Sequence, residues 1–180
     1  MDNIPAQVVG FLGAGAYFVC FQQKKRRNIL IFTVLASCLF VVHFLMLGAY
    51  TGAALNAVNA VRSVIYANNG KRWASSKLWL VFFLAVSSVS CILTWKDAYS
   101  LFPLASMLIT SVSYWLKDEK LIRLITLPTS PSWFIYNMHS GSVSGMITEL
   151  IVSASLITAI IRYDVIAAVK KKKELNNNAC

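Results

Sequence analysis

The sequence predicts an all-α, polytopic membrane protein with seven transmembrane helices, arranged as two parallel three-helix repeats joined by a linker helix. Three observations predict it: a very apolar composition, basic residues gathered at the ends of apolar segments, and a partial match between the two halves of the chain. Hydrophobic residues make up 57% of the 180 residues, charged residues only 13%, and the mean hydropathy is +0.62. A soluble domain of this length needs a more charged surface, so a soluble globule is excluded.

The charge distribution excludes other classes of protein. The net charge is +10, but the basic residues lie at the ends of apolar segments, as they do in the cytoplasmic loops of membrane proteins. Nucleic acid is therefore not an expected partner. The cysteines have no paired spacing, so neither a disulfide framework nor a metal site is predicted, and no cofactor is expected: Cys20, Cys38, Cys91 and Cys180.

Apolar stretches long enough to cross a bilayer predict the seven spans. The sixth contains Pro128 and Pro131, and neighbouring helices, hydroxyl groups or water can satisfy the backbone groups that such prolines leave free. The expected spans are 4–21, 28–47, 49–66, 78–95, 99–116, 121–139 and 142–161.

The basic clusters predict the orientation of these spans. Short loops rich in Lys and Arg stay in the cytoplasm. Lys96 is the only basic residue assigned to the outer side, so we expect the N-terminus outside and the C-terminus inside. A six-span arrangement without the third helix would place a basic cluster outside. The clusters assigned to the cytoplasm are 24–27, 71–77, 117–120 and 170–173.

The two halves of the chain match at a constant offset of 93 residues, as in the identical pairs Ser37/Ser130, Gly48/Gly141 and Gly52/Gly145. Helices one to three then correspond to helices five to seven, and helix four is left over. Repeats that enter the membrane in the same direction are related by an axis along the membrane normal, an arrangement found in small-molecule carriers. The predicted units are 1–66 (first three-helix unit), 67–97 (basic loop and linker helix), 98–163 (second unit) and 164–180 (basic tail).

Polar residues inside the third and seventh spans are the candidate solute-binding groups. Such groups are expensive at membrane depth, so they usually face the bundle interior or a cavity. Glu149 is the only acid deep in a span, and aromatic residues of the sixth span could stack on a ring-shaped solute. The predicted substrate-binding residues are Asn56, Asn59, Arg62, Trp133, Asn137 and Glu149.

Each of these residues also has a structural interpretation. Asn56 and Asn59 could form interhelical hydrogen bonds, and Arg62 could extend to the inner interface. An acid at this depth is protonated, paired or hydrated. Glu149 could therefore pair with Arg62 or Arg162, bind the solute, or couple transport to protons.

Two further sets of residues complete the prediction. His43 is a second candidate for proton coupling, although a hydrogen-bonded helix residue is the alternative. Glycines four residues apart favour close helix packing. The glycines assigned to packing are Gly48, Gly52, Gly141 and Gly145.

The sequence contains no nucleophile with a base, no metal-ligand spacing and no phosphate-binding loop, so an enzyme is not expected. The function predicted is an integral membrane carrier, a uniporter or a proton-linked carrier, for a small polar metabolite such as a sugar or a vitamin-like compound. A non-transporting membrane scaffold or receptor module with the same fold is the alternative. The expected partners are a small-molecule solute, membrane lipid and, as an open alternative, further copies of the chain in a homo-oligomer.

The stretch HFLMLGAYTGAALNAVNAVRS, its preceding basic loop and the later SWFIYN and GSVSG segments resemble the bacterial inner-membrane YgjV-like family. More distantly, the chain is similar to the sweet/PQ-loop and nicotinamide-riboside-transporter group, whose helices are arranged as three plus one plus three. The resemblance implies a location in the bacterial inner membrane. Sweet-type carriers place an asparagine of the third and seventh helices at the central site; Asn56 matches the first position and Glu149 stands at the second. The sequence has no Pro–Gln pair, and Pro5 and Pro103 are not equivalent under the offset.

Overall fold

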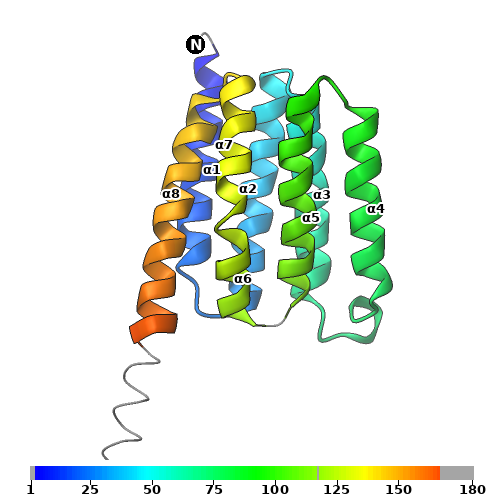
Figure 1. The fold of residues 1–180 in the computed structure, drawn as a ribbon, viewed down its shortest axis with the longest axis vertical. Coiled ribbons are helices and arrows are strands. Elements are labelled where there is room, and N and C mark those ends of the chain that lie inside the picture. The colour runs from blue at the N-terminus through cyan, green and yellow to red at the C-terminus, as the bar shows by residue number, and fades with distance from the viewer. Residues whose placement is uncertain (1–2, 117, 167–180) are drawn as a thin grey trace, which may run out of the picture.

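A computed structural model describes residues 3–116 and 118–166 as a bundle of helices that run roughly along one direction (Figure 1). The described part contains eight α-helices. They are α1 (Ile4–Phe21), α2 (Arg26–Met46), α3 (Tyr50–Ala67), α4 (Leu78–Leu93), α5 (Leu101–Trp115), α6 (Glu119–Thr126), α7 (Thr129–His139) and α8 (Val143–Ala159).

Short helical turns extend this set. The 3₁₀ turns η1 (Arg72–Ala74) and η2 (Ala98–Ser100) precede α4 and α5, and α8 continues into the π-helical segment η3 (Ile160–Val165). Local sequence explains several helix starts, because a side-chain oxygen can accept the backbone N–H groups that the first turn leaves free. Asn3 serves α1 in this way, Asp118 serves α6 and Ser142 serves α8.

The predicted spans correspond closely to the helices, with one difference. The first has the expected bounds, and the predicted interruption of the sixth divides it into α6 and α7 at Leu127 and Pro128. Three helical segments are long and apolar enough to cross a membrane: Ile4–Phe21, Arg26–Met46 and Val143–Val165. Helix α4 is apolar but shorter. The all-α class is therefore confirmed. The lysines at 170–173, assigned to a cytoplasmic tail, lie outside the described residues.

The surface of the bundle is apolar and its interior is rich in hydroxyl groups, the reverse of a soluble protein. Leu78, Leu93 and Ile4 are 76%, 78% and 70% exposed. Many serines are fully buried instead, among them Ser37, Ser63, Ser87, Ser106, Ser111 and Ser113. This distribution fits a protein whose outer surface contacts lipid and whose interior is polar.

Six helical elements, with α6 and α7 counted as one, form a closed ring of contacts. Helix α2 packs between α1 and α3, and α7 packs between α5 and α8. The ring closes where α1 packs against α8 and where α3 packs against α5, while α4 lies outside it against α3 and α5. Under the offset of 93 residues, these six helix–helix contacts fall into three equivalent pairs. The α1–α2 contact corresponds to α5–α7, the α2–α3 contact to α7–α8, and the α3–α5 contact to α1–α8.

The helix bounds follow the same offset. Adding 93 to the bounds of α2 gives 119–139, which runs from the start of α6 to the end of α7. Adding it to the start of α3 gives Val143, the start of α8.

The glycines predicted to pack helices fall into two kinds. Gly48 and Gly141 have backbone φ angles of +66° and +68°, and a Cβ at either would meet nothing within 4 Å. Their role is therefore to turn the chain between helices, and the packing role predicted for them is wrong. Gly52 and Gly145 do lie at close approaches: a Cβ on Gly52 would lie 3.0 Å from Phe44, and one on Gly145 would overlap Asn137.

Candidate functional site

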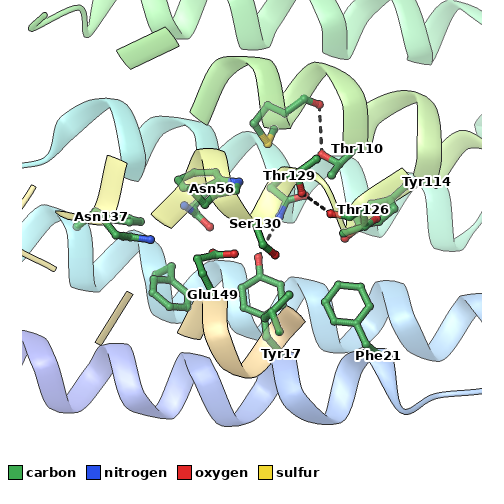
Figure 2. A pocket seen from close by; sticks show the side chains of 16 residues that line it. Tyr17, Phe21, Asn56, Thr110, Tyr114, Thr126, Thr129, Ser130, Asn137 and Glu149 are labelled. Carbon is green, nitrogen blue, oxygen red and sulfur yellow. Dashed lines mark hydrogen bonds between the residues drawn. The ribbon is translucent and has the colours of Figure 1, made fainter. Parts of the chain in front are cut away.

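A pocket lies inside the ring, between the two halves of the bundle (Figure 2). About 60 Å³ of it is open to the centres of water-sized molecules, which is room for a few waters. Every helix of the ring contributes to its wall. The lining residues are Tyr17, Phe21, Phe40, Phe44, Asn56, Asn59, Met107, Thr110, Tyr114, Thr126, Thr129, Ser130, Trp133, Asn137, Glu149 and Val152.

Most of these lining residues are related by the offset of 93. Twelve of the sixteen form six pairs, in which one residue comes from each half of the chain. The two halves of the chain therefore contribute equivalent positions to the wall of the pocket. The pairs are Tyr17/Thr110, Phe21/Tyr114, Phe40/Trp133, Phe44/Asn137, Asn56/Glu149 and Asn59/Val152.

Five of the six predicted substrate-binding residues line this pocket, and they come from three different helices. Asn56 and Asn59 are on α3, Trp133 and Asn137 on α7, and Glu149 on α8. Arg62 is the exception and does not line it.

Glu149 extends its carboxylate into the middle of the pocket, near Tyr17 and Ser130 (Figure 2). The Ser130 side chain is the hydrogen-bonding group that faces this carboxylate, and within residues 3–116 and 118–166 neither Arg62 nor Arg162 pairs with it. A carboxylate in this position has a strong requirement for a proton, a donor or a cation.

Other polar groups of the wall also lack partners. The hydroxyl groups of Ser130 and Thr126 and the Oδ1 atom of Asn137 are buried without a hydrogen bond in the described part of the chain. The amide nitrogen of Asn56 donates to the Gly52 carbonyl oxygen over 2.9 Å. Because a carbonyl only accepts, the amide orientation of Asn56 is fixed, and its Oδ1 faces away as an acceptor.

Asn59, in the wall of the pocket, is joined to Arg62 behind it by a buried hydrogen-bond network. The Asn59 amide donates to Ser37 over 2.7 Å, and its Oδ1 accepts from Arg62 over 2.6 Å. The Arg62 guanidinium continues to Ser111, to Thr110 and to the Met107 carbonyl oxygen at 3.0 Å, all on α5. Arg62 is 0% exposed, so the extension to the inner interface that we considered is wrong; the residue joins α3 to α5.

His43 lies beside the pocket without lining it. Its Nδ1 donates to the Ala6 carbonyl oxygen over 2.7 Å, and its Nε2 lies 2.7 Å from the Ser142 hydroxyl. Both ring nitrogens are thus engaged, and the second contact joins α2 to α8.

Tyr136, an aromatic residue of the sixth span that was not among the predicted substrate-binding residues, makes the corresponding contact on the other side of the ring. Its hydroxyl accepts the Gly52 N–H over 2.8 Å, joining α7 to α3, and the residue is 4% exposed. His43 and Tyr136 are equivalent under the offset, so two matched hydrogen bonds join the halves.

Sequence reasoning also missed several lining residues. Tyr17 and Phe44 lie in apolar stretches and carry no charge, so nothing local distinguishes them, and Ser130 is one of several hydroxyl residues in the proline-containing run 126–132. The offset could have found Phe44, because it pairs with the predicted site residue Asn137.

Asp97 and His139 meet at the end of the bundle that carries the N-terminus. Asp97 accepts a hydrogen bond from His139 over 2.6 Å. Desolvation opposes ionisation of Asp97, but the bonds from His139 and the Tyr99 amide and the charge of Lys96 outweigh it, so its pKa is lowered. Within the described residues, no three His, Cys, Asp or Glu side chains come together as a metal site.

Comparison with known families decides the affiliation. The family model Imp-YgjV, described as bacterial inner membrane protein, matches residues 4–166. The chain belongs to this family. The resemblance expected from the sequence is thereby confirmed, and the chain is a multi-pass integral protein of the bacterial inner membrane. No curated protein and no solved structure matches this member of the Imp-YgjV family.

Proposed function

We propose that the protein is a membrane carrier, a uniporter or a proton-linked carrier, for a small polar metabolite such as a sugar or a vitamin-like compound. It has seven spans, and residues 1–66 and 98–163 form two parallel units around the linker helix α4. The observation that carries the proposal is the pocket between the two halves of the bundle, with six equivalent pairs of residues in its wall. Carriers built from repeats bind their solute at such an interface.

The polar groups of the wall support a solute-binding role. A buried polar group without a partner costs free energy, and the ordinary solution is a partner within the protein. Here the Ser130 hydroxyl and the Asn137 Oδ1 are buried without a hydrogen bond in the described part of the chain, and no ion pair in that part holds the Glu149 carboxylate. Water or a solute in the pocket supplies the missing partners.

Cross-unit contacts on both sides of the pocket support alternating access. Towards the N-terminal end of the bundle, the halves are joined by the contacts His43–Ser142 and Tyr136–Gly52. A rocking motion opens one side by breaking its contacts while those on the other side persist.

Towards the opposite end of the bundle, Arg26 at the start of α2 makes the contacts between the units. Its guanidinium donates to the carbonyl oxygens of Tyr114 over 2.6 Å, Leu116 over 3.2 Å and Tyr66 over 2.9 Å. Arg26 therefore ties the first unit to the end of α5. Glu149 lies in the pocket, between these two sets of contacts. It is the group through which a proton would be coupled to the rocking motion.

The positive-inside pattern places the N-terminus in the periplasm and the C-terminus in the cytoplasm. A topology reporter fused after Lys173 should give a cytoplasmic signal, and one placed before Ile4 a periplasmic signal. Signals from the same side would contradict both the seven-span arrangement and the parallel repeat.

The direct test is a screen for metabolites that stabilise the purified protein, followed by uptake into proteoliposomes. A ligand at 100 times its Kd raises the free energy of unfolding by about 2.7 kcal/mol. Glu149→Gln should leave the thermal stability of the empty protein nearly unchanged but abolish the ligand shift and uptake. Asp97→Asn, which removes an acid at the end of the bundle and outside the pocket wall, is the control and should retain both.

The outcomes separate the carrier from the alternative and from an enzyme. A metabolite that stabilises the protein without being taken up would favour a receptor module. No stabilising metabolite and no uptake would favour a scaffold. Chemical conversion of the metabolite would contradict our proposal that the protein is not an enzyme.

A further inference from the structure

We propose that the pocket binds a small organic cation, a primary or quaternary ammonium compound, with Glu149 as its counter-charge. The inference deepens the proposed function, on which it rests for the transport of the cation, whereas binding can be measured by itself. Three features of the wall support it: its charge, its fixed acceptor atoms and its aromatic side chains.

The charge of the wall has one sign. Glu149 is the only ionisable acid or base other than tyrosine among the lining residues. The nearest buried cation, Arg62, is bound to Asn59 and to α5, and its guanidinium lies 5.2 Å from the centre of the Tyr114 ring. An anionic solute would therefore meet a carboxylate in the pocket and no basic side chain in its wall.

The hydrogen-bonding atoms that remain in the wall include fixed acceptors. One N–H of the Asn56 amide donates to the Gly52 carbonyl oxygen, which fixes the amide and leaves the Asn56 Oδ1 as an acceptor across the pocket from Glu149 (Figure 2). The hydroxyl group of Thr129 donates to a backbone carbonyl oxygen, so its proton is not available to a solute. A primary ammonium group, which only donates, matches an amide oxygen and a carboxylate, whereas a quaternary ammonium has no N–H and would rely on the carboxylate charge and the aromatic rings.

Aromatic rings form much of the remaining wall. The Phe44 and Trp133 rings are stacked with their centres 6.2 Å apart, and Phe40 lies 5.9 Å from Tyr17. Ring faces attract cations, most strongly where water is excluded. The combination of a carboxylate with several aromatic rings is the usual chemistry of ammonium recognition. The small open volume favours a compact ammonium compound over a sugar.

The test uses three probes of similar size and different charge: propylammonium, 1-butanol and butyrate, with potassium chloride as a control for ionic strength. Calorimetry and thermal unfolding of the full-length protein measure binding at one pH. Of the three probes, only propylammonium should bind the wild-type protein. Tetramethylammonium, tested separately as a quaternary ammonium compound, should bind as well. Glu149→Gln should weaken propylammonium binding at least tenfold, while Asp97→Asn, which removes an acid at the end of the bundle, should not change it.

A charge-retaining variant keeps the test decisive if Glu149→Gln does not fold. Glu149→Asp should still prefer propylammonium over butanol, with reduced affinity. Equal binding of all three probes, binding of butyrate, or a cation preference that survives in Glu149→Gln would overturn the inference. Cation binding without uptake would overturn the carrier alone. Uptake of a neutral solute without cation binding would overturn this inference and leave the carrier standing.

Discussion

Replacing Tyr136 by Phe tests the contact between the halves most directly. The change removes the hydroxyl that accepts the Gly52 N–H over 2.8 Å and leaves the ring, which packs 5.9 Å from Phe44. Gly52 lies in the first turn of α3, where backbone N–H groups have no partner within the helix. The variant therefore leaves a buried donor unsatisfied without creating a large cavity.

The magnitude follows from measured interhelical hydrogen bonds in membrane proteins, which average about 0.6 kcal/mol and reach about 1.7 kcal/mol. The Tyr136 bond is short, buried and made to an otherwise free donor, so we expect a loss near the upper value. For a chain of this size, such a loss lowers the midpoint of thermal unfolding by about 3–6 °C. It also raises the population of the state open at this end by a factor of about 10, because 1.4 kcal/mol is tenfold in an equilibrium constant.

The assay is thermal unfolding in detergent, together with labelling of a cysteine at Asn56 by a membrane-impermeant thiol reagent added from outside. Tyr50→Phe is the matched control, because Tyr50 is 64% exposed and its hydroxyl has no partner in the described part of the chain. Tyr136→Phe should lower the midpoint and speed labelling, and Tyr50→Phe should do neither. If the two variants behave alike, the hydroxyl of Tyr136 does not hold the halves together.

Three further predictions follow from the packing. Arg62→Gln should lower the free energy of unfolding by about 3 kcal/mol or more, because a buried guanidinium with several acceptors is lost. In equilibrium unfolding, this loss should add to that of Glu149→Gln within about 0.5 kcal/mol. Recovery of stability in the double variant would mean that the two residues pair. Gly48→Ala and Gly141→Ala should each lower the free energy of unfolding by about 1–2 kcal/mol, because both residues have a positive φ. Gly15→Ala, in open space within α1, should raise it by about 0.5–1 kcal/mol. Equal effects in equilibrium unfolding would contradict the turn role of Gly48 and Gly141. In a background without the native cysteines, Asn56→Cys should react with a small water-soluble thiol reagent, while Val61→Cys, on the outer surface of α3, should not; equal labelling would show that α3 is not a span.

The helices could be predicted from the sequence because their signals are local. Apolar length, basic clusters and turn glycines set the limits of each helix, and Pro128 marks the break in the sixth span. The offset of 93 predicted which helices correspond, and the ring contacts follow it. These signals need no knowledge of which side chains meet.

The partners of individual side chains could not be predicted in this way. Three polar residues of α3 look alike in the sequence: Asn56, Asn59 and Arg62. Only the two asparagines line the pocket. The reason is that α5 packs against α3 and presents hydroxyl and carbonyl oxygens at the level of Arg62. Such a contact depends on the rotation of α5 about its axis, and no property of α3 alone contains it.

The break between α6 and α7 makes the two halves mechanically unequal. Helix α2 is one rigid rod of 21 residues, while its counterpart is a piece of 8 residues joined to one of 11. The short piece is fastened to η3 through Arg123 and Asp164, 2.6 Å apart. Bending at Leu127 and Pro128 therefore displaces α6 and η3 together while Tyr136, on the far side of the joint, keeps its place against Gly52. The end of the bundle that carries α6 and η3 can therefore move by bending at one point in the chain, without a rotation of a whole three-helix unit.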